Sequence, residues 1–164
     1  MNEPLQSFVE SLREEMKQYG ELLALLEAQQ EQVVRRLADE LTETVSAINS
    51  QAEVIQGARR ERDQRRRELT RSLLLSDETQ ITQLIPALPE SYRPLISALV
   101  GENNQLLARV QQRAQRNHIL LSRSLELMGQ FINALCAVGA PTYNEAGIMA
   151  SAAAPGRALY EAVG

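Results

Sequence analysis

The feature that most constrains the fold is a seven-residue repeat of apolar side chains at the start of the chain. Two series of positions, each with a spacing of seven, are apolar at nine of their ten positions. Heptad spacing places such residues along one seam of a helix. The repeat therefore predicts a long helix over residues 4–37 that packs against a neighbouring helix. The two series are Leu5, Leu12, Tyr19, Leu26, Val33 and Val9, Met16, Leu23, Gln30, Leu37.

The phase of this repeat shifts near Leu37, where two successive steps of four replace the alternation of three and four. Such a shift indicates either a stutter in one helix or a break between two. We favour a tight turn at 37–39 and a second helix over 39–75, with Asp39 as its N-cap. The alternative is a dimeric structural coiled-coil protein in which residues 1–75 form one helix about 100 Å long.

Proline residues divide the rest of the chain. Asp77 and Gln80 have the spacing of a capping box and predict a short helix over 77–85. Three prolines then exclude a regular helix through 85–93, and a last long helix is expected over 92–138. Residues 140–164 are rich in Ala, Gly and Pro and predict a flexible tail. The fold expected is all-α, an elongated antiparallel bundle (1–139) of three long helices, with a short helix between the second and third.

Composition argues against several classes of protein. With 24 Leu and 20 Ala against 2 Phe and no Trp, the chain has the composition of a helical protein. Its single Cys and single His exclude an internal disulfide and a Cys-based zinc site, and suit a reducing compartment. No membrane span or signal peptide is visible. We expect a cytoplasmic protein that is not an enzyme, with no cofactor, no metal and no membrane insertion.

Charge is distributed in blocks. Residues 1–57 carry a net charge of −7, residues 58–72 one of +4, and residues 73–164 one of −1. In an antiparallel hairpin, residues near 15 face residues near 62, so the acids of the first helix are expected to meet the Arg run. The run Arg59–Arg71 is interrupted by acids and has no interleaved aromatic residue, which argues against nucleic acid as a partner.

The last long helix carries two signals. Asn103 and Asn117 interrupt its apolar seam, and a buried Asn is typical of a residue that fixes helix register. After His118 the apolar face widens beyond what a narrow seam needs. Part of it is expected to pack on the first two helices, and the rest to form a groove for an incoming amphipathic helix. The residues chosen for this surface are Leu121, Leu125, Met128, Phe131, Ile132 and Leu135.

Three stretches together resemble the FlgN family of flagellar export chaperones. They are residues 22–66, residues 102–135, and the segment TYNEAG at 142–147. The resemblance implies a small helical cytoplasmic protein without catalytic activity. It would bind the C-terminal region of hook-associated proteins, the junction subunits between hook and filament, and deliver them to the flagellar export gate.

The resemblance also implies roles for particular residues. Thr142 and Tyr143 would match the family's gate-docking segment, and the apolar face of the last helix would match its client surface. The sequence does not identify which hook-associated protein is the client. It also leaves open whether the free protein is a monomer or a homodimer.

Overall fold

The structure, a computed structural model, describes residues 2–138; at a few positions within this range, Phe131 and Leu135 among them, only the backbone is described. Every element in this range is a helix, which confirms the all-α prediction there. The elements are α1 (Asn2–Arg35), α2 (Ala38–Ser72), α3 (Ile81–Leu84), the 3₁₀ helix η1 (Ile85–Ala87) and α4 (Arg93–Val138). The predicted tail, 140–164, lies outside the described residues.

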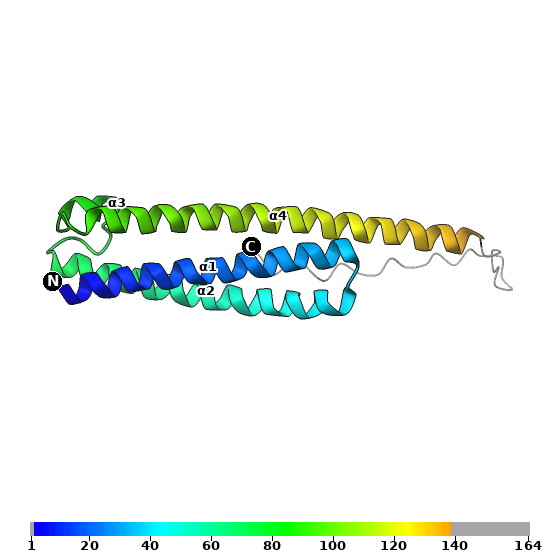
Figure 1. Ribbon diagram of the computed structural model, residues 1–164, viewed down its shortest axis with the longest axis horizontal. Helices are drawn as coiled ribbons and strands as arrows, with labels where there is room; N and C mark the ends of the chain where they lie inside the picture. The colour runs from blue at the N-terminus through cyan, green and yellow to red at the C-terminus, as the bar shows by residue number, and fades with distance from the viewer. Residues whose placement is uncertain (1, 139–164) are drawn as a thin grey trace, which may run out of the picture. The chain divides into compact units, whose positions relative to one another are not determined.

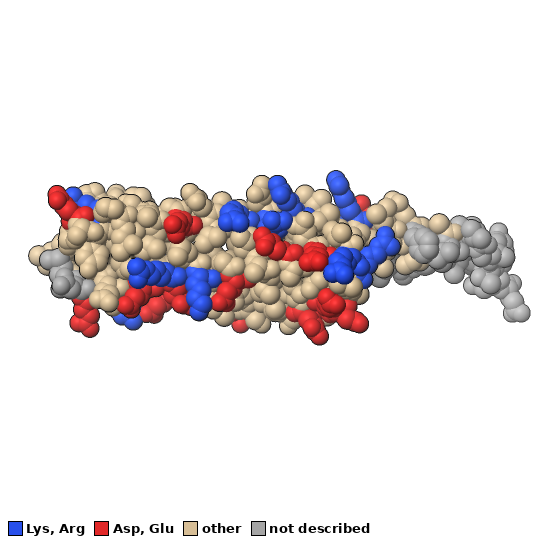
Figure 2. Space-filling view, in the orientation of Figure 1, with Lys and Arg blue, Asp and Glu red and all other residues tan. Residues whose placement is uncertain are grey.

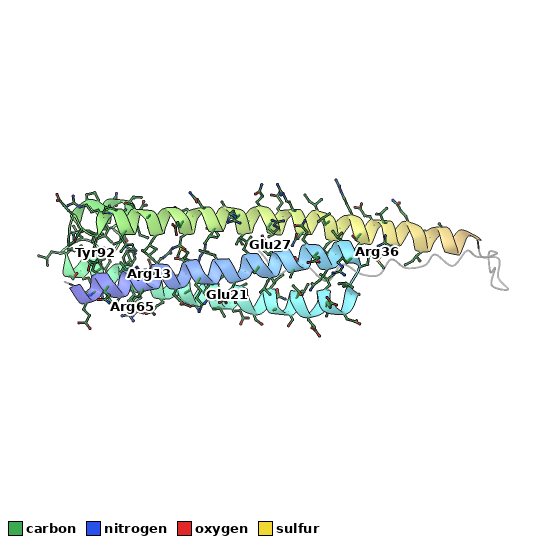
Figure 3. The ribbon with its side chains drawn as sticks, viewed as in Figure 1. Arg13, Glu21, Glu27, Arg36, Arg65 and Tyr92 are labelled. Atoms are coloured by element: carbon green, nitrogen blue, oxygen red, sulfur yellow. The ribbon has the colours of Figure 1, made fainter. Side chains whose placement is uncertain are left out.

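The three long helices lie side by side in a bundle that comprises the chain up to Leu125 (Figure 1). Helices α1 and α4 run in the same direction, and α2 runs antiparallel to both. The chain reverses at Arg36, at the opposite end of the bundle from Tyr92 (Figure 3). Residues 2–72 therefore form two helices, which corrects the alternative of one continuous helix over 1–75. The described residues from Glu126 to Val138 belong to a second unit.

Both helices of the hairpin end at a residue in the left-handed conformation. Arg36 has φ 58° and Leu74 has φ 57°. In each case the next amide bonds back across the turn: Leu37 N–H to the carbonyl of Gln32 at 3.0 Å, and Leu75 N–H to that of Thr70 at 2.8 Å. This is a Schellman arrangement, which usually has glycine at the left-handed position.

The expected N-cap and the expected short helix both differ from the structure. Leu37 occupies the N-cap position of α2, and Asp39 lies in the first turn instead. The short helix begins at Ile81, not at residue 77, and the backbone N–H of Gln80 donates to Gln83 Oε1 at 3.2 Å. Asp77 does not cap it because the guanidinium of Arg71 binds its carboxylate, with Nε at 2.9 Å from Oδ1.

The main core lies at the end of the bundle where the connection between α2 and α4 crosses it. Leu84 and Leu88 from this connection are almost fully buried there, as expected for residues that close one end of the bundle. A smaller cluster lies farther along α1 and α4. The main cluster comprises Leu5, Phe8, Val9, Leu12, Leu69, Leu84, Leu88, Ile96 and Leu99, and the smaller one Leu23, Leu26 and Val110.

Candidate functional site

Two asparagines fix the position of α4 along α1. Asn103 Nδ2 donates to the carbonyl of Leu12 at 3.0 Å, and Asn117 Nδ2 donates to that of Leu26 at 2.7 Å. Both pairs are 91 residues apart in sequence, so the two helices keep one register over four turns. Asn103 and Asn117 are 6% and 1% exposed. Both asparagines are buried with a hydrogen-bond partner on α1, as a residue that sets helix register must be; that they set it stays a prediction.

The face of α4 that carries these asparagines continues toward the C-terminal end of the helix. Positions 117, 121, 125, 128 and 132 follow one another at steps of three or four and so share one face. Asn117 is buried and Leu121 is half-buried. Leu125, Met128 and Ile132 are 69%, 61% and 54% exposed. One apolar face thus passes from buried to exposed along a single helix.

The other residues predicted for the functional site lie outside what the structure describes. The side chains of Phe131 and Leu135 are not described, and neither are Thr142 and Tyr143. Leu127 is a further exposed leucine, 63% accessible, that the sequence analysis did not select. It lies about 200° around the helix from Leu125 but only four residues before Phe131, so it borders the predicted surface.

A buried polar network joins α1 to α2. Arg62 Nη1 donates to Glu15 Oε1 and Oε2 at 3.2 and 3.1 Å, although Glu15 is only 2% exposed. Tyr19 Oη donates to Glu15 Oε1 at 2.9 Å and accepts from Arg59 Nε at 2.8 Å. Burial, above all, raises the pKa of Tyr19. The network confirms that the acids of α1 meet the Arg run near residues 15 and 62.

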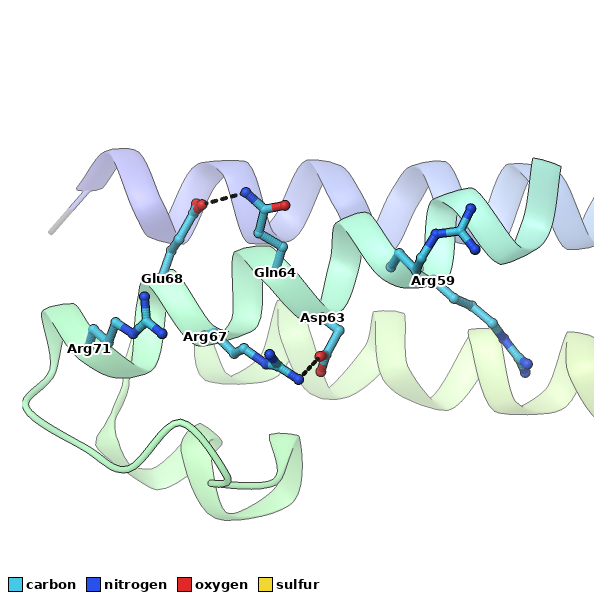
Figure 4. Close-up of a pocket in the computed structure, with 7 residues that line it drawn as sticks. Arg59, Asp63, Gln64, Arg67, Glu68 and Arg71 are labelled. Carbon is cyan, nitrogen blue, oxygen red and sulfur yellow. Dashed lines mark hydrogen bonds and ion pairs between the residues drawn. The ribbon is translucent and has the colours of Figure 1, made fainter. Parts of the chain in front are cut away.

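Other arginines of the run are also engaged within the chain, although Arg60 is not engaged with any described residue. A shallow groove along α2 is lined by residues from Arg59 to Arg71, and Arg67 pairs there with Asp63 at 2.9 Å (Figure 4). Arg66 Nη1 donates to the backbone carbonyls of Asp77 and Thr79, at 2.8 and 2.6 Å. The hydrogen bond from Arg71 lowers the pKa of Asp77. These cations hold helices and the connection in place.

Comparison with known proteins places the chain in a family. The sequence model of the FlgN protein family matches residues 1–151. The chain belongs to the FlgN family. No curated protein and no solved structure shows a significant match to it. Since FlgN proteins are flagellar export chaperones, this chain is one too. The matched range includes the exposed residues Leu125, Met128 and Ile132 of α4 and extends over Thr142 and Tyr143.

The described part of this FlgN protein offers little for other kinds of site. Between residues 2 and 138, no three His, Cys, Asp or Glu side chains come together as metal ligands. None of the helices in that range has a stretch apolar and long enough to cross a membrane.

Helix α4 contains a basic segment that the net charge of residues 73–164 does not reveal. Residues 73–164 are close to neutral, yet residues 103–125 contain four Arg and no acidic residue. A sliding count of charge over about three helical turns would have found this segment. Arg113 bonds across to α1, where its Nη2 lies 3.5 Å from Glu27 Oε1. The other three are Arg109, Arg116 and Arg123, and all are exposed.

Proposed function

We propose that this chaperone binds the C-terminal segments of hook-associated proteins through one apolar stripe on α4, and performs no catalysis. The observation that carries the proposal is the exposure of Leu125, Met128 and Ile132 on a face that is buried earlier in the same helix. The client stripe comprises Leu121, Leu125, Met128, Phe131, Ile132 and Leu135.

A stripe of this kind suits an amphipathic helix of the client. Laying an apolar helix face into an apolar surface is a recurring mode of recognition, and it hides client surface that would otherwise aggregate. Burying roughly 400 Å² at about 25 cal/mol per Å² gives near 10 kcal/mol before the costs of association. Binding in the micromolar to nanomolar range follows, and release needs no chemical step. The flexible thioether of Met128 favours tolerance of different clients.

The test replaces exposed members of the stripe and measures affinity for the C-terminal segment of a hook-associated protein. Leu125→Ser, Met128→Ser and Ile132→Ser combined should weaken binding by about 100-fold or more, because three apolar contacts are lost. The matched control is Ile119→Ser, an exposed apolar side chain two residues before Leu121 and so about 200° around the same helix from it. It should bind as the wild type does. If the triple variant keeps its affinity, or the control loses it equally, the stripe is not the client surface.

We further propose that Thr142 and Tyr143 dock the loaded chaperone on the flagellar export gate, in the cytoplasm. Support comes from the sequence: the Thr-Tyr pair lies within the residues matched by the family. Tyr143→Ala should leave client affinity unchanged and reduce secretion of the client from cells. If this variant secreted the client as efficiently as the wild type, the proposed role of Tyr143 in delivery would be wrong.

A further inference from the structure

Three exposed arginines form a row along α4. Arg109, Arg116 and Arg123 are spaced by seven residues, close to two helical turns, so they lie on one side of the helix. Figure 2 shows Lys and Arg atoms gathered over the middle of α4. All three lie within the bundle that ends at Leu125. We refer to these three residues as the basic row.

The basic row has no partner among the described residues. None of its three members forms an ion pair or hydrogen bond with any residue between 2 and 138. The sequence explains this for Arg109 and Arg116, because the positions three and four residues on either side of them hold no acid. Within the Arg run of α2, by contrast, ion pairs hold Arg65 and Arg67 to carboxylates of the same helix.

We propose that the basic row binds an acidic helix of a partner protein whose carboxylates are also spaced by seven residues. Seven residues of helix rise about 10.5 Å, so carboxylates at i, i+7 and i+14 of a helix lying alongside α4 meet the three guanidinium groups in turn. Ile119, 43% exposed, lies three residues after Arg116 and four before Arg123. It supplies an apolar contact between two of the charges.

Nucleic acid fits this row less well. Proteins that depend on the phosphate backbone make roughly 6–10 phosphate contacts, and the row offers three cations. Residues 93–130 of α4 contain no Phe, Tyr or Trp on which a base could stack. An acidic helix needs neither feature.

The row lies on the opposite side of α4 from Leu121 and Leu125, the residues of the client stripe that are nearest to it. Arg123 follows Leu121 by two residues, which places it about 200° around the helix. A partner on the row therefore does not displace a client from the stripe, so the two surfaces can be occupied together. The inference does not rest on the identity of the client.

The test uses the full-length chain and a synthetic acidic peptide. The probe is a fluorescent helical peptide of about 21 residues with three Glu at seven-residue spacing; its comparison peptide has the same composition with Glu spaced by five, which distributes the charges around the helix. Fluorescence anisotropy at low salt measures the affinity of each peptide. We expect the heptad peptide to bind at least about tenfold more tightly, and both peptides to weaken as salt rises.

Two triple variants distinguish an effect of the basic row on peptide binding from an effect of the protein's net charge. Arg109→Gln, Arg116→Gln and Arg123→Gln combined should weaken heptad-peptide binding at least about tenfold. The matched control is Arg13→Gln, Arg36→Gln and Arg60→Gln combined, since these arginines are also exposed and equally unpaired among the described residues. It should stay within about twofold of wild type. Circular dichroism verifies that both variants remain helical.

Four results would overturn the proposal. They are no peptide binding, equal affinity for the two peptides, equal weakening in both triple variants, and tighter row-dependent binding of a short RNA duplex than of the peptide. The variant Leu125→Ser, Met128→Ser and Ile132→Ser should bind the heptad peptide normally. The proposal for the basic row and the proposal for the client stripe can therefore be disproved independently of each other.

Discussion

At the scale of single residues, one buried carboxylate organises the contact between α1 and α2. Glu15 accepts hydrogen bonds from Arg62 and Tyr19, and its Oε1 lies 3.7 Å from Arg59 Nε. The guanidinium of Arg59 also lies 5.7 Å from the centre of the Tyr19 ring, within range of a cation–π interaction. A carboxylate buried this deeply is tolerated because its partners are in place around it.

Removing the charge of Glu15 should therefore destabilise the bundle. Breaking a fully buried ion pair costs about 3–5 kcal/mol, but Arg59 and Arg62 remain 37% and 29% exposed and can be partly hydrated. We expect Glu15→Gln to lower the free energy of unfolding by about 2 kcal/mol in urea denaturation. The neighbouring Glu14→Gln is exposed and should change it by less than about 0.5 kcal/mol. Equal effects would mean that the network contributes nothing specific.

At the scale of elements, polar contacts set how α4 lies along α1. Asn117 donates to two acceptors on α1, the carbonyl of Leu26 and Oε1 of Gln29, at 2.7 and 2.9 Å. Gln29 is itself 4% exposed. Apolar packing and bonds to backbone carbonyls both permit a slip by one heptad, whereas the bond to the Gln29 side chain is made in one register only.

Replacing Asn117 tests this directly. Asn117→Ala leaves the buried Oε1 of Gln29 without its donor and should cost about 1–3 kcal/mol of unfolding free energy. Asn104→Ala, at the adjacent exposed position, should lie within about 0.5 kcal/mol of wild type. Thermal or urea unfolding of the two variants makes the comparison. A neutral Asn117→Ala would show that packing fixes the register without the asparagine.

The long helices and the facing of Glu15 and Arg62 could be predicted because both follow from spacing along one segment. The helix ends could not, because Arg36 and Leu74 adopt left-handed conformations where glycine would have been the visible signal. The start of α3 was predicted wrongly because Arg66 and Arg71 of another helix bind the segment before it. Contacts of that kind are set by the tertiary fold and leave no local pattern.

The candidate site was predictable to a similar degree. The apolar width of residues 119–135 identified Leu125, Met128 and Ile132, which the structure shows to be exposed. The basic row escaped notice because charge was summed over a long segment that also holds acids. The roles of these surfaces stay predictions, since recognition depends on a second molecule.

At the scale of the whole molecule, we propose that α4 serves both the fold and recognition. Its apolar face is buried at Asn117, which binds α1, and exposed at Leu125, Met128 and Ile132. A flagellar export chaperone must hold a client and still release it intact. A surface on one face of a helix, separate from the core that keeps the bundle folded, allows both.

The most direct test of this account is methyl NMR of the protein labelled with ¹³C at its methionine methyl groups. The chain has four Met, of which Met128 lies in the client stripe and Met16 packs against the main core. Met128→Leu assigns the first resonance and Met16→Leu the second. On titration with the C-terminal segment of a hook-associated protein, the Met128 resonance should shift to saturation while that of Met16 stays in place. Saturable binding that leaves Met128 unchanged would contradict the claim that α4 holds the client.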